Sequence, residues 1–160
     1  MTAQTEFLST STKAKGALFN VAKDEIKENG PIMTGSIDVA DQKILLSGFL
    51  RTSNTNGSNY LSLALSAPLP EGYTDADKEG QLRYYGKMFR QTDKRSDSSP
   101  DYTGFISVLP CTSPHQYTNE QWDDAPTLQV AGWRKRNADG TSRISISIAP
   151  REVAADEVNF

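Results

Sequence analysis

Cysteine and histidine are almost missing from this sequence, which has one of each, Cys111 and His115, among its 160 residues. A single cysteine excludes an internal disulfide and is typical of a protein from a reducing compartment. The two residues could supply at most half of the usual ligands of a structural zinc site, so we expect no metal. They lie four positions apart in a proline-flanked loop, where a free thiol and a solvated imidazole are far more common than a catalytic pair.

Other features of enzymes and membrane proteins are missing too. The carboxylates gather in linkers and at the tail, in no spacing that would place two of them across a substrate, and there is no glycine-rich phosphate-binding loop. No apolar run approaches the roughly 20 residues that span a bilayer, and Met1 to Lys15 lacks the apolar core of a secretory signal. We therefore expect a cytoplasmic protein that is not an enzyme, uses no cofactor and does not contact a membrane.

What the chain does contain is an internal repeat, in which four short motifs occur twice in the same order. The first copy holds Gly16–Phe19, Pro31–Ile37, Gly48–Arg51 and Gly57–Leu65. The second copy holds Gly86–Phe89, Pro100–Ile106, Gly132–Lys135 and Gly140–Ile148. Short patterns often match by chance, but an ordered series of four does not, so we interpret the chain as a duplication.

Each copy is predicted to form β-strands. In Leu61–Leu65 and Ile144–Ile148, large apolar residues alternate with small ones, as in a strand with one face on a core. Asp139-Gly140 between two strand patterns predicts a hairpin. The expected strands are 16–19, 34–39, 43–51 and 60–66 in the first copy, and 84–89, 103–109, 127–136 and 142–149 in the second. A helix is expected only over Ala22–Asn29, as one or two turns at most.

The fold class that follows is all-β. An isolated unit of about 50 residues would be marginally stable, so the two copies should share a core. We predict two tandem four-stranded antiparallel units, packed about a pseudo-twofold axis as a sandwich or an OB-like barrel.

The chain is divided as follows. A flexible N-terminus (1–12) precedes the first repeat (13–68), an acidic linker (69–82) leads to the second repeat (83–150), and an acidic tail (151–160) ends the sequence. The second repeat also contains an insertion, 110–126, with three prolines, Tyr117 and Trp122. A loop of this length is usually functional or disordered, and the sequence leaves open whether it binds anything.

The net charge is −3, yet positive charge is concentrated in two segments. Residues 83–95 have a net charge of +4 and residues 133–143 a net charge of +3. A local positive field can persist beside a negative total, because exposed charges are screened beyond about 10 Å at ordinary salt. Simple solvation of strand faces and turns is the alternative interpretation.

Aromatic residues are interleaved with these cations. Rings stack on unpaired bases while Lys and Arg follow the phosphates, so this mixture favours single-stranded nucleic acid over duplex. Alternation along the strand places one of Tyr84 and Tyr85 inside, and core packing is the alternative for Trp133 and for Phe49. The candidate binding residues are Arg83, Tyr84, Tyr85, Lys87, Arg90, Trp133, Arg134, Lys135, Arg136 and Arg143, with Arg51 and Tyr60 as a weaker version in the first copy.

The last residues of the sequence form an acidic run that ends in phenylalanine. This tip resembles that of bacterial and phage single-stranded DNA-binding proteins. The resemblance covers about five residues and lacks the glycine-rich linker that usually precedes them. It implies that Asp156, Glu157 and Phe160 bind replication or recombination proteins, or compete with DNA for the basic surface.

The repeated motifs also resemble a family of small phage- and plasmid-encoded β-proteins of unassigned function, with the pattern Gly-x-Leu-Phe, Pro-x-Tyr-Thr-Gly, Gly-Trp-x-Lys and Gly-x-x-x-Leu-Ser-Leu. The resemblance covers most of residues 13–150, and the usual member has one copy. The first copy departs from the pattern at Met33, where the family has Tyr, and at Phe49, where it has Trp. The resemblance implies a phage protein in the cytoplasm of a host bacterium.

Our functional prediction is a phage protein that binds single-stranded DNA during replication or recombination. The main alternative is a protein-interaction module that binds or inhibits a host protein and no nucleic acid, and a structural virion component is a weaker third. The sequence leaves open whether the ligand is DNA or RNA, which copy is active, and whether the chain forms a homo-oligomer.

Overall fold

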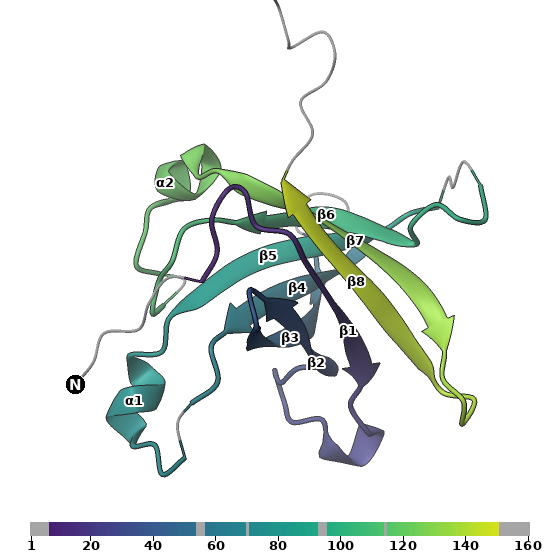
Figure 1. Ribbon diagram of the computed structural model, residues 1–160, viewed down its shortest axis with the longest axis horizontal. Helices are drawn as coiled ribbons and strands as arrows, with labels where there is room; N and C mark the ends of the chain where they lie inside the picture. Colours follow the sequence, from purple (N-terminus) through teal and green to yellow (C-terminus); the bar gives the residue numbers. More distant parts are fainter. Residues whose placement is uncertain (1–6, 54–56, 70, 93–95, 114, 151–160) are drawn as a thin grey trace, which may run out of the picture.

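The computed structural model is a closed barrel of eight antiparallel strands (Figure 1). Each strand pairs with the next along the chain, and β8 pairs back with β1. The structure describes residues 7–53, 57–69, 71–92, 96–113 and 115–150. The strands are β1 (Ala14–Asn20), β2 (Met33–Val39), β3 (Gln42–Thr52), β4 (Asn59–Ser66), β5 (Arg83–Arg90), β6 (Tyr102–Ser107), β7 (Thr127–Arg136) and β8 (Ser142–Pro150). The prediction of an all-β fold with two four-stranded units is confirmed. The two units join edge to edge and close into one barrel.

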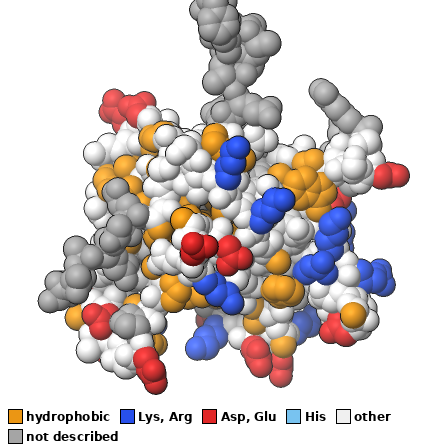
Figure 2. All heavy atoms as spheres, in the orientation of Figure 1, with side chains coloured by type: hydrophobic (Ala, Val, Ile, Leu, Met, Phe, Trp, Pro, Cys, Tyr) orange, Lys and Arg blue, Asp and Glu red, His pale blue; other side chains and the backbone are white. Residues whose placement is uncertain are grey.

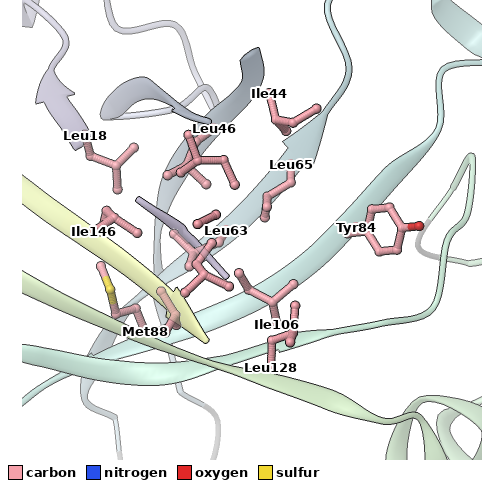
Figure 3. Close-up of a cluster of buried hydrophobic side chains, with 14 of the residues drawn as sticks. Leu18, Ile44, Leu46, Leu63, Leu65, Tyr84, Met88, Ile106, Leu128 and Ile146 are labelled. Carbon is pink, nitrogen blue, oxygen red and sulfur yellow. The ribbon is translucent and has the colours of Figure 1, made fainter. Parts of the chain in front are cut away.

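Alternation along the strands builds the interior of the barrel. Leu61, Leu63 and Leu65 on β4 point inward, while the small residues between them lie on the outer surface. Ile144 and Ile146 occupy the matching positions on β8. These side chains meet those of the other strands in one cluster at the centre of the barrel (Figure 3). The predicted half-buried strands therefore form the wall of one barrel, and both copies share its single core.

The registers of the strands repeat between the two halves. Four pairs show this: Gly48–Leu63 and Gly132–Ile146 within hairpins, and Leu63–Gly86 and Ile146–Gly16 where the halves join. The motif positions thus superimpose when the first half is rotated onto the second. Because odd-numbered strands all run the same way, the pseudo-twofold axis lies along the barrel. Every outward position has a counterpart on the opposite side.

The connections fall into two sets, one at each end of the barrel. One end holds the β1–β2, β3–β4, β5–β6 and β7–β8 connections, and the other holds the β2–β3 turn, the linker and the insertion. The linker contains α1 (Asp75–Glu79) and the insertion contains α2 (Asn119–Asp124), each begun by a threonine capping box. Neither helix was expected, and the segment 22–29 forms only a 3₁₀ turn, η1 (Lys23–Glu25). Within the described residues, no helix is long and apolar enough to cross a membrane.

Candidate nucleic-acid interface

Most of the predicted cations gather at one end of the barrel, where β3, β5 and β7 end and β8 begins. All but Arg143 are exposed there. The residues of this basic end are Arg51, Arg90, Arg134, Lys135, Arg136 and Arg143. In Figure 2, Lys and Arg side chains collect on the right, on the side where Figure 1 draws the β7–β8 hairpin. The two basic segments, distant in sequence, thus contribute to one region.

Acidic residues dominate the opposite end. The linker and the insertion carry Glu71, Asp75, Asp77, Glu79, Glu120, Asp123 and Asp124. Figure 2 shows Asp and Glu side chains over α2 at the upper left and over α1 at the lower left. The net charge of −3 therefore conceals an uneven distribution, with the clustered cations at one end of the barrel and these carboxylates at the other.

Arg83 lies at the acidic end, and its assignment to the same cationic surface as Arg90 is wrong. It begins β5 and Arg90 ends it, so the seven intervening steps separate the two by about 23 Å. Its guanidinium donates to the carbonyl oxygens of Thr112, at 2.9 Å, and Lys78, at 3.2 Å. Arg83 therefore ties the linker to the insertion and is not free to follow a phosphate chain.

Tyr84 is also misassigned, because its ring is fully buried. It packs edge-on against Phe7 with ring centres 4.8 Å apart and forms part of the core cluster (Figure 3). The alternation that buries Tyr84 turns Tyr85 outward. Of the two candidates, only Tyr85 could meet a ligand.

Trp133 belongs neither to the core nor to a freely exposed surface. It lies on the outer face of β7, half-buried, and its indole Nε1 donates to the carbonyl oxygen of Ser98 at 3.0 Å. The next residue is fixed to the same loop, since the backbone N–H of Arg134 donates to an oxygen of Asp101 at 2.7 Å. The β5–β6 loop thus holds the ring in place and limits its use for stacking.

Rings and cations lie side by side on the outer surface of β3 to β6. The Lys87 ammonium lies 5.3 Å from the centre of the Tyr60 ring, which in turn lies 5.6 Å from the Phe89 ring. The Arg51 guanidinium lies 5.2 Å from the ring centre of Phe49. We call this surface the ring–cation face, and its residues are Phe49, Arg51, Tyr60, Lys87, Phe89 and Phe105.

Phe89 and Phe105 were missed as site residues by the sequence reasoning. They are 40% and 37% exposed, so both rings are open to a ligand on the outer surface of the barrel. Phe105 sits directly across the β5–β6 pair from Lys87. The signal was present in the motif Gly-x-Met-Phe: if its glycine and methionine face inward, its phenylalanine must face outward.

The insertion adds a wall to the ring–cation face. A groove of about 1120 Å³ runs over the outer face of β4 to β7 beneath α2. Trp122 of α2 lies edge-on to Tyr85 and to Tyr117, with ring centres 6.4 and 5.5 Å apart. The residues lining the groove include Tyr85, Lys87, Phe89, Phe105, Trp122 and Gln129. The insertion therefore shapes a concave aromatic surface that contains a cation.

Burial shifts the pKa values of two titratable groups near this wall. Burial raises the pKa of the Tyr85 hydroxyl, and Arg83 opposes this only in part, so the phenol is neutral at physiological pH. Burial likewise raises the pKa of the Cys111 thiol, whose backbone forms a bridge to Arg83. Cys111 is buried and His115 is exposed, and among the described residues no cluster of three or more metal-binding side chains occurs.

The predicted tail residues Asp156, Glu157 and Phe160 lie outside the described residues. No family model, no curated protein and no solved structure matches the chain. The resemblance to a phage family and to single-stranded DNA-binding proteins thus stays a prediction.

Proposed function

We propose that this protein binds single-stranded nucleic acid on its ring–cation face. The observation that carries the proposal is the group formed by Lys87, Tyr60 and Phe89: an ammonium over one ring and a second ring beside it, on the outside of a barrel. Rings offer stacking surfaces to bases of any sequence, and cations neutralise the phosphates between them. Both are held on a rigid sheet, so little conformational freedom is lost on binding.

The dimensions of a sheet suit such a ligand. Neighbouring strands lie about 4.8 Å apart and outward residues on one strand about 6.8 Å apart, distances over which successive bases of an extended strand can be spread. From the face, the backbone would continue to the basic end, where Arg51 and Arg90 lie exposed. A duplex, with its bases stacked inside, would leave the rings without partners.

The groove beneath α2 favours the second candidate, a protein-interaction module. Trp122 and Phe105 line a concave surface, and aromatic residues are typical anchors of protein interfaces. Capture of a host protein by apolar anchors would persist at high salt and would be lost on Trp122→Ala. Nucleic-acid binding would weaken steeply with salt instead.

The context we propose, phage replication or recombination in the cytoplasm of a host bacterium, comes from the resemblance of the motifs alone. The same is true of the tail as a partner-binding segment. Neither is needed for the binding test below.

The test is fluorescence anisotropy of labelled oligo-dT, titrated with the protein at several salt concentrations. Phe89→Ala should weaken binding by about 5- to 150-fold, the loss of one stacked base, with little change in salt dependence. The pair Arg51→Ala and Lys87→Ala should reduce the salt slope by about 1.4, since each phosphate contact on a single strand contributes about 0.7.

The matched control is Lys43→Ala, an exposed cation on the outer face of β3 at the other end of that strand. It should leave affinity and slope unchanged. Wild-type affinity in both the Phe89 variant and the double cation variant would refute this assignment of the site.

A further inference from the structure

The two sides of the barrel are related by the pseudo-twofold axis, so the ring–cation face has a counterpart. The registers place Trp133 at the position of Phe49, Lys135 at that of Arg51, and Arg143 at that of Tyr60. Ala17 and Phe19 stand where Lys87 and Phe89 stand. We call these five residues of β7, β8 and β1 the counterpart face.

The counterpart face keeps the exposed motif phenylalanine. Phe19 is 46% exposed, even more than Phe89. It lies directly across the β1–β8 pair from Arg143, which lies across the β7–β8 pair from Lys135. One ring and two cations therefore form a row over three neighbouring strands.

The guanidinium in this row is held in position. Nη1 of Arg143 donates to Oδ1 of Asn137 at 2.8 Å and approaches the carbonyl oxygen of Arg136 at 3.3 Å. These bonds use one nitrogen and leave other donors of the planar group for a ligand. A preorganised guanidinium of this kind suits phosphate recognition.

The two faces nevertheless differ in shape and in chemistry. In the part of the chain that the structure describes, the groove wall lies beside the ring–cation face and has no equivalent on the counterpart face, because a two-residue turn, Ala40-Asp41, takes the place of the insertion in the first copy. On the counterpart face Ala17 replaces Lys87 and Arg143 replaces Tyr60, so each face carries two cations, and the ring of Trp133 is fixed to the β5–β6 loop. The counterpart face is therefore an open surface with as many cations as the first face and fewer rings.

We infer that the counterpart face is a second site for single-stranded nucleic acid, so that one barrel holds two strands at once. The inference rests on the proposed function of the first face. Both faces reach the same basic end, because the axis that relates them runs along the barrel. Arg90, Arg134 and Arg136 at that end would reduce the repulsion between two phosphate backbones. The activity that follows is bridging of two strands, the first step of annealing.

The experiment mixes two short oligo-dT strands, one with a donor fluorophore and one with an acceptor, with the full chain. As wild-type protein is added, energy transfer should rise to a maximum. It should then fall, because excess protein places the two strands on separate barrels. The variant Phe19→Ala should reduce that transfer at least fourfold. It should keep its affinity for a single oligonucleotide within about twofold, since the ring–cation face is intact. Lys43→Ala serves as the control and should bridge normally.

Salt gives a second readout. The counterpart face has as many cations but fewer rings, so it should be the weaker site with a similar salt dependence, and rising salt should take its affinity below the working concentration first. Transfer should therefore vanish at a salt concentration where anisotropy still reports binding.

Energy transfer that persists in the Phe19→Ala variant would overturn the inference, because bridging would then come from another surface or from association of protein copies. A stoichiometry of one oligonucleotide per protein in sedimentation would overturn it as well, while leaving the proposed function intact. No anisotropy change with wild-type protein at low salt would overturn both.

Discussion

Replacing Gly104 with alanine should strongly destabilise the barrel, whereas the same change at Gly48 should be tolerated. Both glycines lie inside strands and face the interior. A Cβ on Gly104 would lie 2.8 Å from the carbonyl carbon of Lys87 and 2.9 Å from Cα of Met88, and would overlap the Lys87 carbonyl oxygen. A Cβ on Gly48 would meet nothing nearer than the side chains of Leu61 and Met33, at 3.7 Å.

The magnitude follows from which atoms must move. Around Gly104 they belong to the backbone of the paired strand, so β5 and β6 would have to separate by about 1 Å and their ladder bonds would weaken. Overpacking alone costs about 1–3 kcal/mol, and two weakened hydrogen bonds add about 1 kcal/mol each. We expect Gly104→Ala to lower the free energy of unfolding by about 3–5 kcal/mol. For Gly48→Ala we expect between no change and a gain of about 1 kcal/mol, from reduced freedom of the unfolded chain.

The assay is urea denaturation followed by tryptophan fluorescence, with both variants and the wild type at one protein concentration. Equal m-values would show that the denatured states are comparable. If the two variants differed by less than about 1 kcal/mol, the close approach of β5 and β6 would not be the reason for glycine at this position. Gly35, its counterpart, meets Ala17 in the same way, so Gly35→Ala should repeat the result.

Two further predictions concern the insertion. Arg83→Ala removes the hydrogen bonds that tie the linker to the insertion, so it should lower the free energy of unfolding by about 1–2 kcal/mol. The affinity for oligo-dT should stay within twofold of the wild type. A large loss of affinity would show instead that Arg83 belongs to the binding surface. Because burial raises the pKa of the Cys111 thiol, it should react with a thiol reagent at pH 8 at least tenfold more slowly than in urea, and equal rates would contradict its burial.

The architecture was largely predictable because its determinants are local. Leu61 to Leu65 alternates in the period of a strand, and Asp139-Gly140 marks the hairpin, where Gly140 has a φ of 89°. Gly57, at the matching turn of the first copy, has a φ of 72°. These signals need only a few neighbouring residues, so they survive without knowledge of the rest of the chain.

The candidate site was predicted less well because it depends on distances between strands. Arg83 and Arg90 are close in sequence, yet the strand that joins them carries them to opposite ends of the barrel. The helices were missed for a related reason. The pair Thr118 and Gln121 is a readable capping box, but a helix of this length has no apolar periodicity to detect.

The repeated motifs turn out to be mostly architectural. The glycines of the first three motifs face inward, where the close approach of strands and the shared core restrict them, and so do Leu18, Met88 and the leucines of β4. The phenylalanine that ends the first motif is different, because it faces outward in both copies.

The two halves differ most where the barrel does not constrain them. Lys87 and Phe105 on the ring–cation face correspond to Ala17 and Ser36 on the other side, and Tyr85 corresponds to Lys15. These are outward positions, and changing them leaves the core intact. A duplicated barrel can therefore keep one fold while its two faces acquire different chemistry. Overall charge and overall pattern then say little about binding, because what matters is which outward residues lie within one strand spacing of each other.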